Sequence, residues 1–238
     1  MAAGPLEQGG GGQTRGWLDR FDAAAARERV TDVNDGVLSL AGLSEGLSAA
    51  HAQPATVLLV IVVSTVAGAI ALASAKLGEG LADREAQQRV VAEERRLLKL
   101  SPAEEVAELA QHFEAKGVSP ETARQVAGEL SAADALSAQL EIEYGILELA
   151  STSGASRNAF WSGVAFLLGA AGPVAIAYLS PGQWLAEYTL AAALTWLSAT
   201  SLVLARLGHT RVLHTLLRSL LIGLTSLGAS YVLASLLF

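Results

Sequence analysis

Residues 56–75 read TVLLVIVVSTVAGAIALASA, twenty residues without a charged side chain. Such a run can cross a bilayer as one α-helix, because a helix rises about 1.5 Å per residue and the hydrocarbon core is about 30 Å thick. Similar runs at roughly 33–51, 158–179, 184–205 and 213–237 predict four more spans. The sequence therefore predicts an all-α membrane protein with five transmembrane helices. The first span is the weakest, because glycines and Glu45 interrupt it.

The composition excludes several classes of function. Hydrophobic residues make up 52% of the 238, and charged residues only 16%. The absence of cysteine excludes disulfides, thiolate metal sites and cysteine catalysis. The formal net charge of -7 arises mainly from acids between residues 76 and 148, and it argues against nucleic acid as a partner.

The distribution of lysine and arginine predicts the topology. Arginines precede the first span and basic residues fill segment 79–157, whereas the links after spans one and three have none. By the positive-inside rule the N-terminus is cytoplasmic. The predicted domains are a disordered tail (1–26), spans one and two (27–78), a cytoplasmic acidic helical domain (79–155) and spans three to five (156–238).

Helix signals divide the cytoplasmic insert. No breaker follows span two, so this helix is predicted to continue beyond the bilayer. Ser101, Pro102 and Glu104 form a capping-box pattern that predicts a helix ending at Gly117. Ser119 and Pro120 predict the next helix, and a last helix is expected over about 132–149.

Glutamates of the insert are candidate metal ligands. Glu104, Glu105 and Glu108 share a helix face, Glu93 and Glu94 lie on the preceding helix, and Glu141, Glu143 and Glu148 lie on the last one. Carboxylates that converge from several helices can hold Mn²⁺ or Fe²⁺. A solvated acidic face, balanced by nearby arginines, is the alternative interpretation.

Small residues predict close helix packing in the membrane. Gly36, Gly42 and Gly46 on span one, and Gly163, Gly169 and Gly172 on span three, would allow backbones to approach each other. Pro173 predicts a kink in span three. These positions also fit ordinary contacts between helices.

Five stretches together resemble the vacuolar iron transporter family. They are DVNDGVLSLAGLSEGLSAA (32–50), VAGAIALASAKLGEG (66–80), SPAEEVAELAQHFEAKGVSPETARQVAGEL (101–130), FLLGAAGPVAIAYL (166–179) and LLRSLLIGLTSLGASYVLA (216–234). The resemblance covers about residues 27–238. It implies a homodimer in the lipid bilayer that moves Fe²⁺, and often Mn²⁺, out of the cytoplasm in exchange for protons. Metal ions are then substrates, and neither a tightly bound cofactor nor enzymatic activity is expected.

The resemblance also implies roles for particular residues. Asp35 matches the pore aspartate of span one. Glu105, Glu108 and Glu94 match glutamates that collect metal, and Glu143 matches the glutamate of a Glu-Leu-Gly pattern, with Glu141 as its neighbour. A bacterial member would lie in the plasma (inner) membrane and a eukaryotic one in a vacuolar-type membrane.

Span two departs from the family pattern at two positions. Leu72 stands where the family has a methionine, so a sulfur ligand is lost, and Lys76 replaces a glutamate. Lys76 could pair with Asp35, repel a divalent cation at the entrance, or extend to the lipid headgroups.

Glu45 needs a partner or a function, because a charged residue inside a bilayer is costly. It is a candidate metal ligand or proton carrier on a transport pathway with Asp35, Leu72 and Lys76. Three hypotheses stay open: a metal/proton antiporter, a divergent member that binds metal without carrying it, and a transporter of other divalent cations.

Overall fold

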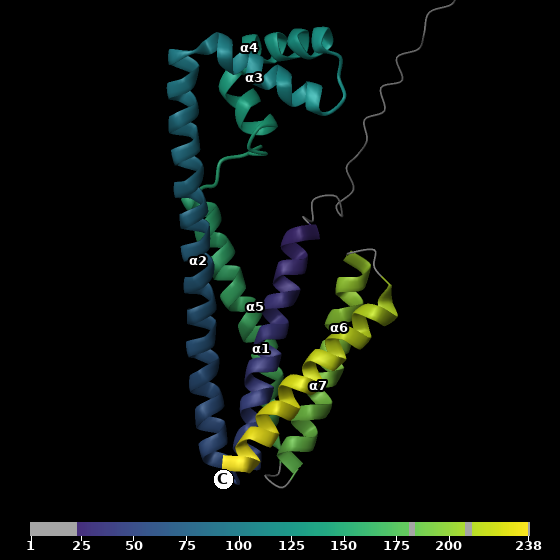
Figure 1. The fold of residues 1–238 in the computed structure, drawn as a ribbon. Helices are drawn as coiled ribbons and strands as arrows, with labels where there is room; N and C mark the ends of the chain where they lie inside the picture. Colours follow the sequence, from purple (N-terminus) through teal and green to yellow (C-terminus); the bar gives the residue numbers. More distant parts are fainter. Residues whose placement is uncertain (1–22, 181–183, 208–210, 238) are drawn as a thin grey trace, which may run out of the picture. The chain divides into compact units, whose positions relative to one another are not determined.

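The structure is a computed structural model that describes residues 23–180, 184–207 and 211–237 (Figure 1). These residues form α-helices and no strand, which confirms the all-α class. The seven helices of the described residues are α1 (Ala23–Ala49), α2 (Pro54–Leu100), α3 (Pro102–Ala115), α4 (Pro120–Ile142), α5 (Thr152–Leu179), α6 (Leu185–Leu207) and α7 (Val212–Leu237). Most of the predicted tail lies outside the described residues, and α1 begins at Ala23.

The described helices form two compact units. The first unit contains the chain up to Ala69 and from Val164 onward, and the second unit contains Ile70–Gly163. The second unit includes the whole predicted insert, from the distal part of α2 to the beginning of α5.

Among the described residues, four helices are long and apolar enough to cross a membrane: α2, α5, α6 and α7. The helix α1 is not among these candidates. Its sequence carries Asp32, Asp35 and Glu45 together with arginines near its beginning, which lowers its apolar character. Four of the five expected helices are therefore apolar enough to span, and the fifth span stays a prediction.

The helix α2 begins at Pro54, as predicted, and continues without interruption to Leu100. Its 47 residues correspond to roughly 70 Å at 1.5 Å per residue, more than twice the thickness of the hydrocarbon core. The preceding link is a tight turn in which His51 has a φ of 57°. The amide of Ala52 donates to the carbonyl of Leu47 at 3.0 Å and closes the end of α1.

Within the first unit, α1 packs against α6 and α7 (Figure 1). Val37 and Ala41 of α1 form a buried cluster with Ala193 of α6 and Leu227 of α7. Two contacts between α1 and α6 are polar. Thr200 donates to Oδ1 of Asn34 at 2.7 Å, and the hydroxyls of Ser44 and Thr189 lie 3.4 Å apart.

Two of the predicted small-residue contacts bring backbones together. A Cβ on Gly36 would collide with the carbonyl oxygen of Phe166 in α5, and a Cβ on Gly169 would collide with the carbonyl oxygen of Val33 in α1. Gly42 faces the Ser230 side chain of α7. A Cβ on Gly172 would meet no atom within 4 Å, so the expected close approach of another helix backbone to Gly172 is not seen among the described residues.

The part of α2 in the first unit buries a single stripe. Val57, Ile61, Thr65 and Ala69 are buried and recur every four residues. The other faces of this segment expose large apolar side chains such as Leu59, Val63 and Val66. An exposed apolar surface of this kind suits lipid or a second protein chain.

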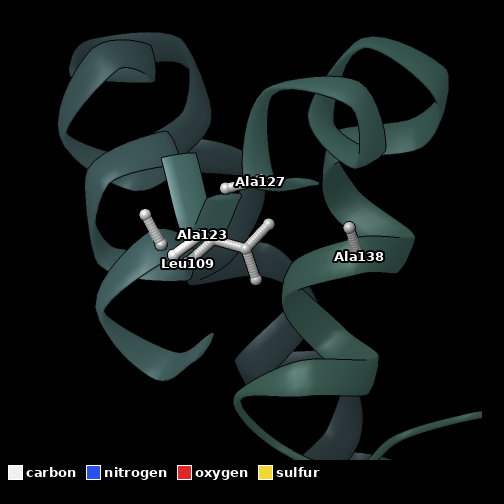
Figure 2. Close-up of a cluster of buried hydrophobic side chains, with 5 residues drawn as sticks. Leu109, Ala123, Ala127 and Ala138 are labelled. Atoms are coloured by element: carbon white, nitrogen blue, oxygen red, sulfur yellow. The ribbon is translucent and has the colours of Figure 1, made fainter. Parts of the chain in front are cut away.

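In the second unit, α3 and α4 pack around a small apolar core (Figure 2). Its buried members are Leu109, Ala110, Ala123, Ala127 and Ala138. Alanines on α4 allow this helix to approach Leu109 closely. The core thereby fixes the face of α3 that carries the candidate ligands.

The predicted helix starts have the expected residues but not all the expected bonds. Ser119 accepts a hydrogen bond from the amide of Thr122 at 3.4 Å, as an N-cap should. Ser101 occupies the N-cap of α3 without a side-chain cap bond, so the expected capping box is wrong in this detail. Its carbonyl instead accepts from the amides of Glu104 and Glu105. Gly117, with a φ of 92°, follows the end of α3 as predicted.

The expected last helix over about 132–149 begins close to its expected start and ends early. A kink at Asp134, where φ is -159° and ψ is 92°, divides α4, and Oδ1 of Asp134 accepts a hydrogen bond from the amide of Ser137 at 3.1 Å. The helix ends at Ile142, because Gly145 takes a φ of 67° and the amide of Ile146 turns back to the carbonyl of Leu140 at 2.8 Å. Glu143 is therefore a helix C-cap.

Candidate functional site

Four carboxylates from three helices influence one another in the second unit. Glu94 lies on the distal part of α2, Glu105 and Glu108 lie on α3, and Glu143 caps α4. All four belong to the predicted metal-ligand set, and we call them the acidic cluster. They meet because α3 and α4 share an apolar core and α3 follows α2 after one residue.

Glu94 is the buried member of the acidic cluster. Its relative exposure is 1%, and its Oε1 has no hydrogen-bond partner within the described residues. Burial, a hydrogen bond with Glu105 and the nearby charges of Glu105, Glu143 and Glu108 raise the pKa of Glu94 to about 7. Glu94 can therefore exchange a proton near neutral pH.

Glu105 is held in place by Gln139. Glu105 is 5% exposed, and the Gln139 side-chain amide donates to its carbonyl oxygen at 2.8 Å and to its Oε2 at 3.4 Å. The oxygen Oε1 of Gln139 is buried and unpaired within the described residues. The amide thus fixes one carboxylate of the cluster and leaves a second oxygen donor beside it.

Tyr144 also belongs to this neighbourhood, although its role was not predicted. Burial, the charge of Glu143 and a hydrogen bond with it, and the charges of Glu94 and Glu108 raise the pKa of the Tyr144 phenol to about 12. The phenol therefore stays neutral and can donate a hydrogen bond to a carboxylate. Its position directly after Glu143 was the signal in the sequence. Glu141, by contrast, is exposed in the last turn of α4.

The acidic cluster does not form a finished coordination shell. Among the described residues, no group of three or more His, Asp or Glu side chains is arranged so that it could hold a metal ion. The carboxylates are close enough to raise the pKa of Glu94 but do not surround a common centre. Binding a cation would require side-chain movement and the loss of the Glu94 proton.

The two aspartates near the beginning of α1 differ in environment. Asp32 is 2% exposed, and its Oδ2 accepts from Nη1 of Arg29 at 2.8 Å. Asp35, the predicted pore residue, is exposed. The buried aspartate is thus held by an arginine, whereas the predicted pathway residue is accessible on the surface of this chain.

Glu45 lies in a pocket of the first unit together with a second acid. The pocket has a volume of about 290 Å³ and includes Glu187 of α6 and Tyr231 of α7. Glu45 is 5% exposed, and its Oε1 has no hydrogen-bond partner within the described residues. Glu187 was not predicted as its neighbour, although it is the one charged residue between positions 158 and 205.

Leu72 and Lys76 lie in the part of α2 that belongs to the second unit. Both are half-buried. Nζ of Lys76 lies 3.3 Å from Oε2 of Glu79, one turn further along the same helix. The lysine thus has a local acidic partner, Glu79, which was not among its predicted partners.

The comparison with known families agrees with this architecture. A model that describes the VIT family matches residues 26–235, nearly the whole chain. A search of the curated proteins finds no significant match. The matched range includes the acidic cluster and all or nearly all of α1 and of the four described helices that could cross a membrane. The chain therefore belongs to the VIT family, the vacuolar iron transporters.

Proposed function

We propose that this chain exports Fe²⁺ or Mn²⁺ from the cytoplasm by exchange for protons, as a homodimer. Its family and its apolar helices indicate an integral membrane protein that transports metal rather than an enzyme. The ion, the direction, the antiport and the dimer are our proposal. The observation that carries it is the environment of Glu94. This buried carboxylate lies beside three others, and its own pKa is raised to about 7.

In this proposal the acidic cluster captures metal and returns a proton. Carboxylate and amide oxygens suit Mn²⁺ and Fe²⁺. The acidic cluster offers the carboxylates, and the side chain of Gln139 offers an amide oxygen beside them. A divalent cation that enters would lower the pKa of Glu94 and release its proton. Capture at the surface of the insert would raise the local metal concentration for the membrane part of the protein.

The proposed membrane pathway uses Asp35 at the entrance and Glu45 further along α1. Glu45 lies ten residues after Asp35, roughly 15 Å along the helix. It shares its pocket with Glu187, so two carboxylates could bind either a cation or a proton at that level. Leu72 offers no sulfur ligand, which favours ions that accept oxygen donors only. The proposal includes five spans, with α1 held in the membrane by α5, α6 and α7.

Uptake into proteoliposomes tests the proposed transport. Vesicles with an acidic lumen and a fluorescent metal indicator inside would receive Mn²⁺ or Fe²⁺ from the outside. We expect uptake by the unaltered protein and its loss, by about tenfold or more, in Asp35→Asn and Glu45→Gln, because each variant removes a carboxylate from the pathway. Asp83→Asn, an exposed aspartate of α2, is the matched control and should transport normally.

The capture site is tested in the same vesicles. Glu105→Gln combined with Glu108→Gln should reduce uptake at low metal concentration and less so at saturation, whereas Glu104→Gln on the same helix should not. Absence of uptake, together with metal binding that the double variant abolishes, would support a second function. This second function is metal binding without transport. Two features favour it: Leu72 stands where the family has a sulfur ligand, and Lys76 places a cation, paired with Glu79, on the same helix.

A further inference from the structure

A basic pocket of about 650 Å³ opens in the first unit. It is lined by residues near the beginning of α1, the end of α6 and the beginning of α7. Its polar lining consists of Arg27, Thr31, Arg211, His214, Thr215 and Arg218. Leu204 of α6 adds an apolar wall. Three guanidinium groups thus face one open space, although Arg27 is distant in the sequence from Arg211 and Arg218, and no acidic residue among those described lines it.

The charges in this pocket are not balanced by carboxylates. Within the described residues, none of Arg27, Arg211 and Arg218 forms an ion pair. Some other arginines are paired, such as Arg29 with Asp32 at 2.8 Å and Arg89 with Glu85 at 2.6 Å. In a chain with a net charge of -7, a pocket with three unpaired cations is suited to an anion from outside the protein.

The position of α7 adds a second reason. The N-terminus of a helix carries a partial positive charge and usually has acidic residues nearby. The first turn of α7 has none, and Arg211 directly precedes it. The first backbone bond of this helix joins the amide of Thr215 to the carbonyl of Arg211 at 3.1 Å. The amides of residues 212–214 precede that bond and can bind an anion.

We propose that the basic pocket binds a phosphate group. An arginine guanidinium can donate two parallel hydrogen bonds to a pair of phosphate oxygens. Three guanidinium groups around a helix N-terminus therefore supply more donors than the two oxygens of a carboxylate can accept from. The pocket lies where α6 ends and α7 begins, at the ends of two helices that could cross a membrane. The phosphate belongs either to the headgroup of an anionic lipid or to a soluble phosphate compound.

Native mass spectrometry of the purified full-length protein tests the lipid source. The protein would be mixed with phosphatidylglycerol or with phosphatidylcholine, which share a phosphate but differ in net charge. We expect phosphatidylglycerol adducts on the unaltered protein and at least about fivefold fewer on the triple variant Arg27→Gln, Arg211→Gln, Arg218→Gln, because each lost cation weakens binding to an anionic lipid. Arg206→Gln, at the end of α6 but outside the pocket lining, is the matched control and should retain its adducts.

A thermal-shift assay with inorganic phosphate and with ATP tests the soluble source. In one outcome, phosphate or ATP raises the Tm of the unaltered protein and of Arg206→Gln but not that of the triple variant. This result would support the site with a soluble ligand, even if no lipid adducts formed. Equal adducts and equal stabilisation in the triple variant and the unaltered protein would overturn the proposal. Size-exclusion chromatography checks folding, and an Arg→Lys version of the triple variant, which keeps the charges, should retain part of the binding. Neither readout depends on metal transport.

Discussion

At the scale of single residues, Glu94 links protonation to the stability of the insert. It is buried beside three other carboxylates, and its pKa rises from 4.5 to about 7 in the folded chain. Between these two values the folded chain holds a proton that the unfolded chain has released. The free energy of unfolding therefore falls as the pH rises through this window.

We predict that Glu94→Gln reduces this dependence on pH. The amide keeps the shape of the side chain but has no proton to lose. The shift in pKa corresponds to at most about 3 kcal/mol, or several degrees in Tm. Melting curves of the full-length protein in detergent from pH 5 to pH 8 should therefore show a larger fall in Tm for the unaltered protein than for Glu94→Gln.

Glu93→Gln is the matched control for this measurement. Glu93 is adjacent in the sequence, but its side chain is exposed and pairs with Arg96 at 3.0 Å. Exposed pairs contribute little to stability. The Tm of Glu93→Gln should depend on pH as the Tm of the unaltered protein does. If the Tm of Glu94→Gln showed this same dependence, the result would contradict a raised pKa at Glu94.

At the scale of helices, α1 and α5 depend on two glycines. Gly36 and Gly169 each face backbone atoms of the other helix, so an added methyl group could be accommodated only if the helices moved apart. We predict that Gly36→Ala or Gly169→Ala lowers the Tm of the purified protein, because overpacking typically costs about 1–3 kcal/mol.

Gly172→Ala, on the same helix as Gly169, provides the comparison. Its Cβ would enter open space, and alanine favours a helix over glycine. The Tm of this variant should be unchanged or higher when the variants are compared by thermal unfolding. A fall in Tm as large as that of Gly169→Ala would show that these glycines matter for a reason other than the α1–α5 contact.

Helix boundaries were predictable where a residue determines the local backbone. Pro54, Ser119 with Pro120, and Gly117 begin or end helices as expected, because ring geometry, capping and positive φ act over a few residues. The turn at Gly145 was missed, because its φ depends on the contacts that follow α4. The sequence could not pair Glu45 with Glu187 or Gln139 with Glu105, since such neighbours depend on how helices pack.

At the scale of the whole molecule, the exposed apolar surface of α2 supports the proposed dimer. Leu59, Val63, Val66 and Ile70 are exposed and recur at spacings of four, three and four residues along one helix face. A stripe with this spacing is typical of helices that pack against another helix. The homodimer that the resemblance implies would then form through this surface of the chain.

The absence of cysteine makes this prediction easy to test. A single Val66→Cys substitution should form a disulfide-linked dimer in membranes after mild oxidation, because the stripe would meet its copy. Leu221→Cys on α7 is similarly exposed and should remain a monomer on non-reducing gels. Equal cross-linking at both positions, or at neither, would contradict a dimer formed through α2.

The packing of α1 also has a consequence for the synthesis of the protein. The helix α1 emerges from the ribosome before α6, but its polar groups Asn34 and Ser44 bond to Thr200 and Thr189, about 150 residues later. At about 5–20 residues per second, these partners arrive roughly 8 to 30 s after α1. Until then the polar groups of α1 would lack these partners, and α1 would be only partly inserted or shielded by the insertion machinery. Stable insertion of α1 in the bilayer would therefore follow the synthesis of its later partner helices.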